Sequence, residues 1–145
     1  MLTGGLLQCR RERMGLSREV LASLLVQAPA AWEARGVGTP VSVDMLRQWE
    51  RGRDTMPAWV EPALDWCWAQ WQRAVDELVE ELAAHPGQGV AVHHSDEMMR
   101  RERLSAGDIP SAAWWRSVAL EAADRTSAPL GTPRDLQRAG VGSWW

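Results

Sequence analysis

Apolar residues recur at the spacing of amphipathic helices along most of this chain. Leu21, for example, is followed by Leu24 and Leu25, three and four positions later. Such spacing places side chains on one face of a helix. The same pattern predicts helices at about 3–14, 18–26, within 41–57, at 57–85, 96–104 and 110–125. Only Val90-Ala91-Val92 predicts a strand, so the chain is predicted to be mainly α.

The longest predicted helix, from Pro57 to His85, is apolar on two sides. One side repeats every four and three positions, through Leu64, Trp68, Trp71, Val75, Leu78 and Leu82. The other side, in its first half, carries Trp59, Ala63, Trp66 and Ala74. A helix with two apolar sides contacts two partners. We expect one side to pack on the N-terminal helices and the other to meet a second subunit or the C-terminal residues. One intramolecular core for all of them is the alternative.

The stretch Val41–Pro57 predicts a short helix with an apolar back and a polar front. Ser42 is suited to cap its first turn, and Gly52 is suited to a left-handed residue at its end. Leu46 and Trp49 share the apolar face. The other faces carry Arg47, Gln48 and Arg51. Arginine and glutamine bind guanine and adenine edges in the major groove through paired hydrogen bonds, so this helix has the chemistry to read DNA.

These residues resemble a known family. Val41-Ser42, Leu46 and Trp49-Glu50-Arg51-Gly52-Arg53 are similar to the recognition helix of phage-repressor-type (Cro/C1, XRE) helix-turn-helix regulators. Residues further upstream resemble the first two helices of that domain, namely Leu7, Arg11, Gly15-Leu16-Ser17-Arg18, Leu21-Ala22 and Leu24-Leu25. The resemblance implies a helix-turn-helix domain over 1–57 that binds double-stranded DNA. Its candidate DNA-binding residues are Ser42, Val43, Asp44, Arg47, Gln48, Arg51, Arg53, Ser17 and Arg18.

Residues 26–40 depart from that family, in which only a few residues join the second and third helices. Pro29 and Gly36 could begin and end an added helical piece. One interpretation is a tolerated surface loop with Trp32 tucked in. The other is a second contact to DNA or a partner through Arg35. We favour the surface loop, because connecting segments generally tolerate insertions.

Glu50 places a carboxylate inside the helix proposed to face DNA. An unpaired carboxylate there would repel phosphates. We therefore predict that Glu50 is tied to Arg10 or Arg11 of the first helix, and that it matters for folding more than for base choice.

The second half predicts a strand at 90–92, a helix at 96–104 capped by Ser95, and a helix over Pro110–Arg125. Val90–His94, Ser95-Asp96 and Trp114-Trp115-Arg116 resemble a group of helix-turn-helix autoregulators associated with anti-CRISPR operons. The resemblance implies a dimerisation module over 87–126. The residues we assign to the dimer interface are Trp114, Trp115, Val118, Trp144, Trp145, Trp71 and Leu78. Residues 127–145 are rich in Gly, Pro, Ser and Ala, which predicts an irregular tail.

The predicted fold is therefore a helix-turn-helix bundle, a long connecting helix over 58–86, and a small C-terminal α module with a short strand. The net charge of −3 is unevenly distributed: residues 1–57 carry +2, 58–99 carry −7 and 100–145 carry +2. All 16 basic residues are Arg, because the chain has no Lys. Acidity thus lies away from the proposed reading helix, but the positive charge available to one subunit is small.

Candidate sites for other chemistry are lacking in the sequence. Cys9 and Cys67 lack metal-ligand spacing and are expected to be free thiols in the cytoplasm. No stretch is apolar enough to predict a membrane span, and no catalytic, cofactor or metal site is predicted. We expect a dimeric repressor that acts on an inverted repeat. Its own gene is a candidate target. The alternative is an antitoxin-like or adaptor protein whose C-terminal module binds another protein.

Overall fold

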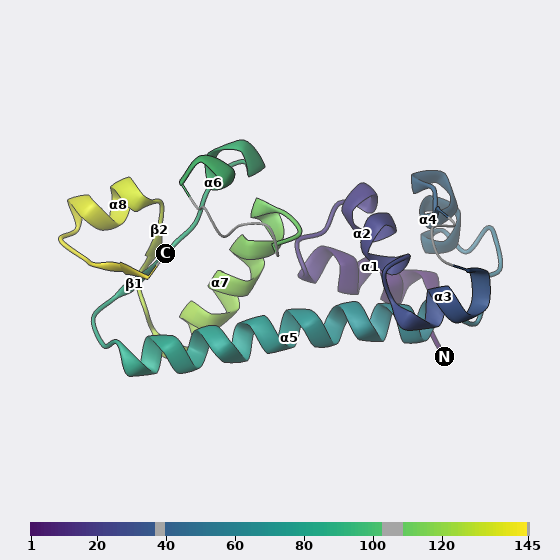
Figure 1. Cartoon of the computed structure of the whole chain (residues 1–145), viewed down its shortest axis with the longest axis horizontal. Helices are drawn as coiled ribbons and strands as arrows, with labels where there is room; N and C mark the ends of the chain where they lie inside the picture. The colour runs from purple at the N-terminus through teal and green to yellow at the C-terminus, as the bar shows by residue number, and fades with distance from the viewer. Residues whose placement is uncertain (37–39, 103–108, 145) are drawn as a thin grey trace. The chain divides into compact units, whose positions relative to one another are not determined.

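Helices dominate the computed structural model, which describes residues 1–36, 40–102 and 109–144 (Figure 1). The prediction of a mainly α chain with a long helix and a short β segment is confirmed. The chain divides into two compact units, Met1–Gln70 and Trp71–Trp145. The sequence predicts one connecting segment over 58–86, and the division falls inside it. Among the described residues, no helix combines the length and apolar character needed to cross a membrane.

The first unit contains α1 (Gly4–Arg13), α2 (Arg18–Leu25), α3 (Pro29–Arg35), α4 (Val43–Glu50) and the beginning of α5 (Val60–Ala84). Side-chain caps set the starts of three of these helices, as the sequence predicts. The hydroxyls of Thr3, Ser17 and Ser42 accept hydrogen bonds from backbone N–H groups of α1, α2 and α4. Each cap satisfies a first-turn donor that has no partner within its helix.

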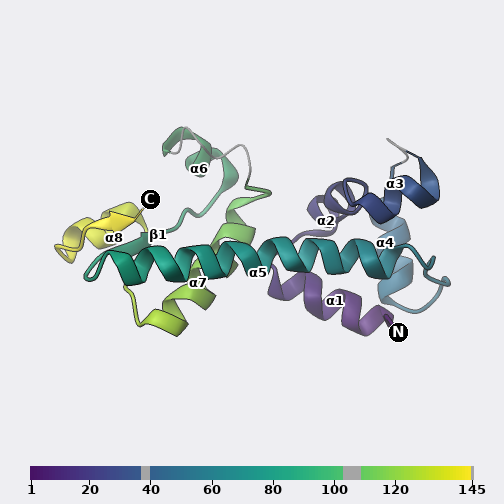
Figure 2. The ribbon, with the colours of Figure 1, turned by 60° about the horizontal axis from the view of Figure 1, so that its bottom comes forward.

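The core of the first unit is formed by side chains of α1, α2, α4 and the start of α5, whose ribbons Figure 2 shows. It is formed by apolar side chains, among them Leu7, Met14, Leu21, Leu25, Leu46, Trp49, Val60 and Leu64. At Gly4 the backbone of α1 lies very close to that of α4, because a Cβ atom there would lie 2.2 Å from the carbonyl oxygen of Trp49. The start of α1 therefore lies directly against the end of α4, and only glycine allows this.

The long helix begins three residues later than predicted, at Val60 rather than at Pro57. The carbonyl of Pro57 instead accepts a turn hydrogen bond from the Val60 N–H. The proline within the first turn is Pro62, whose missing N–H costs nothing where helical donors are unpaired anyway. The helix ends close to the predicted His85, at Ala84.

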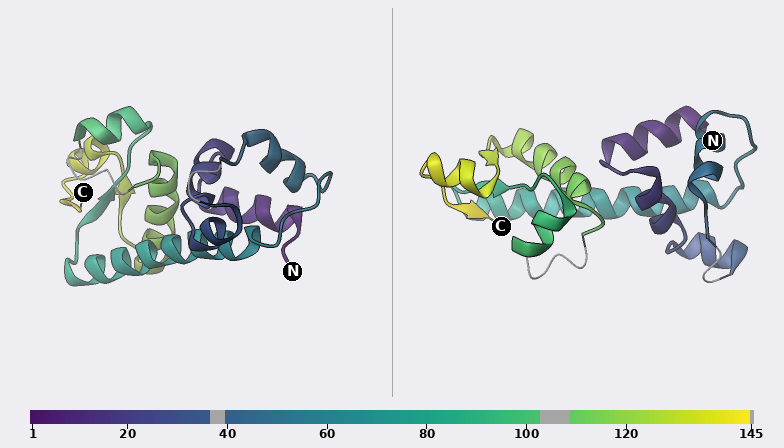
Figure 3. Two further views of the ribbon diagram at one scale, coloured as in Figure 1. Left: turned by 45° about the vertical axis from the view of Figure 1, so that its right-hand side comes forward. Right: turned by 90° about the horizontal axis from the view of Figure 1, so that it is seen from above.

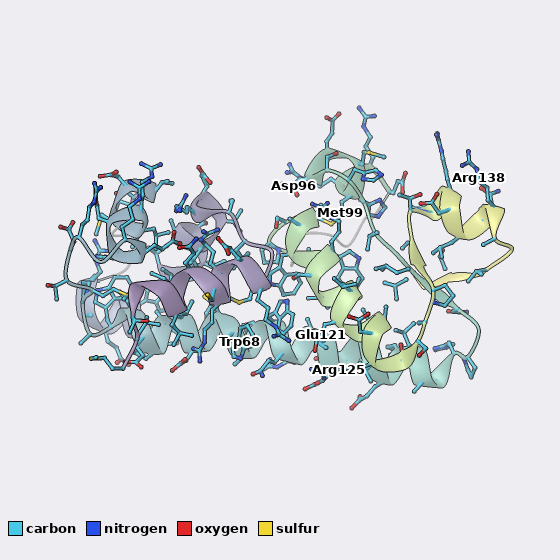
Figure 4. The ribbon with its side chains drawn as sticks, turned by 180° about the vertical axis from the view of Figure 1, so that it is seen from behind. Trp68, Asp96, Met99, Glu121, Arg125 and Arg138 are labelled. Carbon is cyan, nitrogen blue, oxygen red and sulfur yellow. The ribbon has the colours of Figure 1, made fainter. Side chains whose placement is uncertain are left out.

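The second unit consists of the rest of α5, β1 (Gly89–Ala91), α6 (Asp96–Glu102), α7 (Ala112–Thr126), β2 (Leu130–Gly131), α8 (Pro133–Arg138) and β3 (Ser143–Trp144). The predicted strand, β1, is the centre of a parallel sheet of order β2-β1-β3. Ser95 caps α6 through the Met98 N–H, as predicted. Arg125 of α7 binds Glu121 one turn earlier and Asp76 of α5 (Figure 4).

The predicted irregular tail over 127–145 is wrong. These residues supply two of the three strands and α8, and they return to β1 (yellow in Figure 3). Thr132 and Asp135 form a reciprocal capping box that starts α8. Leu136 is then buried beside Gly89, at which a Cβ would meet the Leu136 side chain at 2.7 Å. The tail is therefore part of the folded module.

The predicted dimer interface is also wrong for every member whose side chain the structure describes. Exposed fractions are 8% for Trp114, 7% for Trp115, 0% for Val118, 2% for Trp71 and 4% for Leu78. The indole of Trp71 donates to the hydroxyl of Ser117, and that of Trp115 donates to the carbonyl of Ala91, both at 2.9 Å. These side chains are the core of the second unit, so they offer no surface to another chain. The Trp144 side chain and Trp145 lie outside the described residues.

The role of the tail can be tested with Leu136→Ala. We expect this variant to lose about 2–4 kcal/mol of stability, because it removes a buried side chain and leaves a cavity. Urea denaturation followed by tryptophan fluorescence measures the loss. Gln137→Ala changes the exposed neighbour on the same helix and should stay within about 0.5 kcal/mol of wild type. Equal stability of the two variants would show that the tail does not support the core.

Candidate nucleic-acid interface

The buried side of α4 is fixed by Leu46 and Trp49, whose exposed fractions are 0% and 3%. Its other side is accessible. Ser42 and Asp44 are exposed, and Val43, Arg47 and Gln48 are partly exposed. The structure thus brings these five candidate DNA-binding residues together on one short helix and its cap. The Ser42 hydroxyl is already used, because it accepts from the Met45 N–H at 3.1 Å.

Arg47 forms an ion pair with Asp44, one helical turn earlier on this surface. Its Nη1 donates to Asp44 Oδ1 at 3.2 Å, and the two side chains are 40% and 68% exposed. An ion pair this exposed contributes only about 0–1 kcal/mol. Arg47 can therefore leave Asp44 for a stronger bidentate acceptor at little cost.

Arg51 and Arg53 lie at the C-terminal end of α4 and are both exposed. Gly52, with φ of +66°, turns the chain there in the left-handed region, as the sequence predicts. The N–H of Arg53 then donates to the carbonyl of Gln48 at 2.9 Å, which closes the helix end. Two exposed arginines thereby follow directly on the end of α4.

Glu50 is a buried charged group behind this surface, with a side chain only 1% exposed. Its Oε1 accepts from Arg11 Nε of α1 at 2.6 Å, and its Oε2 lies 2.7 Å from Arg18 Nη2 of α2. Arg11 also donates to the carbonyl of Leu16 at 2.9 Å. The predicted tie between Glu50 and the first helix is confirmed for Arg11. Arg10 instead binds Asp65 at 2.6 Å.

Arg18 was assigned to DNA binding from the sequence, and the structure pairs it with Glu50 inside the protein. Its Nε donates to Glu50 Oε2 at 2.8 Å, so its charge neutralises a carboxylate of the protein. The neighbouring candidate, Ser17, is exposed and caps α2. The sequence contained a partial signal for this tie. Glu50 needed a cation, and Arg18 stands at the start of the helix that must pack against α4.

The electrostatics of Glu50 follow from burial and its two partners. Burial by itself raises the pKa of Glu50. Hydrogen bonds from Arg11 and Arg18, and their positive charges, outweigh burial and hold the pKa below its ordinary value of 4.5. Glu50 is therefore ionised at neutral pH, and α1, α2 and α4 all contribute a side chain to one buried ion cluster.

The inserted segment forms a helix, α3, and the expected tucked position of Trp32 is wrong. Trp32 is 48% exposed, although its indole Nε1 donates to the carbonyl of Val26 at 2.6 Å. Arg35 donates to the carbonyl of Pro40 at 3.1 Å and lies over the Trp59 ring. Sequence reasoning missed this arrangement, because nothing local links Arg35 to a tryptophan beyond α4.

The cysteines and the metal-ligand residue types in the described part of the chain give little support to redox or metal chemistry. Both cysteines are free thiols, as predicted, and burial raises the pKa of Cys67 to about 12. Within the described residues, no group of three His, Cys, Asp or Glu side chains could hold a metal ion. No family model, curated protein or solved structure matches the chain.

Replacing Glu50 tests the buried ion cluster. We expect Glu50→Gln to destabilise the protein by about 3 kcal/mol, because two arginines lose a desolvated partner. Thermal denaturation at neutral pH measures the change. Glu33→Gln, which removes an exposed carboxylate from α3, is the matched control and should melt like wild type. An unchanged melting temperature for Glu50→Gln would contradict the structural role.

The same pair of proteins gives a pH dependence of known sign. The folded-state pKa of Glu50 is below its unfolded-state value, so its stabilisation is fully present above about pH 4.5 and is lost as the pH falls through the folded-state pKa. The stability difference between wild type and Glu50→Gln should therefore be largest near neutral pH and shrink in acid. A difference that grows as the pH falls would contradict this assignment.

Proposed function

We propose that this chain is a sequence-specific regulator that binds double-stranded DNA, with α4 as the helix that enters the major groove. The observation that carries the proposal is the two-sidedness of α4. Its back is buried on Leu46 and Trp49, while Arg47 and Gln48 remain accessible on its front. A helix held by its apolar back and presenting Arg and Gln is suited to read base edges.

The positive charge that remains available after internal pairing supports the same assignment. Arg11 and Arg18 neutralise Glu50, and Arg10 binds Asp65. The exposed arginines at the end of α4, Arg51 and Arg53, remain next to the proposed reading face. Phosphate contacts from such residues position a protein on the duplex without selecting its sequence.

We keep a homodimer acting on an inverted repeat as part of this proposal. One unit offers few cations and one short helix, which is little for tight specific binding. A second copy would add a half-site at high effective concentration. The interface must use surface other than the buried tryptophans named above. We further propose that the protein acts in the cytoplasm as a repressor, with its own gene as a candidate target, and that it has no enzymatic activity.

The alternative of an antitoxin-like or adaptor protein is weaker. It places the partner protein on the C-terminal module, where the tryptophans would be natural anchors for a partner. Trp114 and Trp115, the described members of that set, are buried in the chain's own core. We therefore retain DNA binding as the proposed function and treat a second protein partner as subordinate to it.

Two arginine variants test the reading face, using a duplex selected from a randomised DNA pool by the wild-type protein. Arg47→Ala should cost about 1–3 kcal/mol and relax specificity at one base pair. Arg53→Ala should weaken binding to all sequences alike and lower the salt slope. Fluorescence anisotropy at several salt concentrations measures both. Arg73→Ala, which removes an exposed arginine of the second unit, is the charge-matched control. Wild-type binding by both test variants would mean that α4 is not the reading helix.

Assembly is tested by sedimentation of the full chain, alone and with the selected duplex. We expect a dimer at micromolar concentration and half-sites whose centres are about 34–36 Å apart, or a multiple of that spacing. A chain that remains monomeric in both samples would remove the dimer from the proposal and leave single-site binding.

A further inference from the structure

Arg35, the last residue of the inserted helix α3, makes two contacts near the start of α4. Its Nη2 donates to the carbonyl of Pro40 at 3.1 Å, and its Cζ lies 5.3 Å from the centroid of the Trp59 ring. Pro40 is followed by Val41, which is buried, and then by the cap Ser42. The end of α3 is therefore tied to the backbone that leads directly into α4. A guanidinium over an indole face adds a cation–π attraction.

Trp59 connects Arg35 to the buried back of α4. The Trp59 ring centroid lies 6.2 Å from that of Trp49, at an interplanar angle of 80°. This edge-to-face geometry is favourable for aromatic pairs. Trp59 is followed by Val60, a fully buried residue at the start of α5, so its position is fixed as well. Arg35, Trp59 and Trp49 thus form a continuous series of side-chain contacts from α3 to α4.

We propose that the insertion is a positioning element for α4, and that Arg35 and Trp59 are its positioning residues. They hold the entry to α4 and its buried face at the same time. The inference rests on the proposed function, because it concerns the orientation of the same helix toward DNA. Positioning α4 is a third role for the insertion, different from a tolerated surface loop and from a second DNA contact.

The two alternative roles fit the contacts of α3 less well. A merely tolerated loop does not require a hydrogen bond and a cation–π contact from one arginine beside the start of α4. A direct phosphate contact would compete with the two contacts that the Arg35 guanidinium already makes, to the carbonyl of Pro40 and to the Trp59 ring. The exposed aromatic residue of α3 is Trp32, whose indole is fixed to Val26.

The test measures a specificity ratio, the dissociation constant for a scrambled duplex divided by that for the selected duplex. Arg35→Ala should lower this ratio about tenfold, the discrimination of roughly one base pair. The salt slope should not change, because no phosphate contact is lost. Arg35→Lys should retain most of the ratio, since an ammonium can also lie over an indole. Arg73→Ala, equal in charge change, should leave the ratio unaltered.

Variants of Trp59 test whether the two residues act together. Trp59→Phe keeps an aromatic face and should behave like wild type, whereas Trp59→Leu should lower the ratio as Arg35→Ala does. In the double variant, Arg35→Ala with Trp59→Leu, the specificity ratio should fall little further than in the more affected single variant, because both substitutions remove the same contact. Arg35→Gln is the substitute variant in case Arg35→Ala does not fold. It removes the cation but keeps a donor for Pro40, and it should also lower the ratio.

Three results would overturn the inference. A salt slope reduced by about one, with equal weakening on both duplexes, would make Arg35 a phosphate contact. A lower melting temperature with an unchanged specificity ratio would make the contacts purely structural. If the wild-type protein shows no preference for any duplex, the proposed function fails and the positioning role fails with it. That last result appears before any variant is made, so the two failures are distinguishable.

Discussion

The buried carboxylate of Glu50 is the constraint on which the first unit depends. Its side chain is 1% exposed, and a charge so placed is tolerated only with close, well-oriented partners. Those partners, Arg11 and Arg18, come from two different helices, and Glu50 comes from a third. Any rotation of α4 against α1 or α2 would break a charged hydrogen bond. The cluster therefore selects one arrangement of three short helices that apolar contacts alone would specify less strictly.

Local signals in the sequence were sufficient to place most helices. Thr3, Ser17, Ser42 and Ser95 each cap a helix in the structure, and each is recognisable from the residues that immediately follow it. The apolar repeat of α5 was predictable for the same reason, because periodicity depends only on positions along one helix. The division of α4 into an apolar and a polar face was likewise predictable, since residues on opposite faces of a helix are separated by spacing alone.

The partners of these surfaces were not predictable in the same way. Periodicity identifies an apolar face but not the molecule that covers it, so Trp114 and Trp115 suggested an interface although they belong to the chain's own core. The prediction of an irregular tail was wrong for a related reason. β2 and β3 are each two residues long, and parallel pairing with β1 is a non-local event without a sequence signature of its own. The contacts of Arg18 with Glu50 and of Arg35 with Trp59 join residues that lie far apart in the sequence, so local patterns do not reveal them.

Under the proposed function, the distribution of charge gives these fixed contacts a further significance. A protein with many phosphate contacts obtains affinity from electrostatics that is insensitive to small errors in helix orientation. This chain spends Arg11 and Arg18 on Glu50 and holds Arg35 against Trp59. Fewer arginines then remain for phosphate, and discrimination must come from accurate placement of Arg47 and Gln48 against base edges. Rigid support behind α4, from the Glu50 cluster and from the inserted helix, is what such a recognition surface requires.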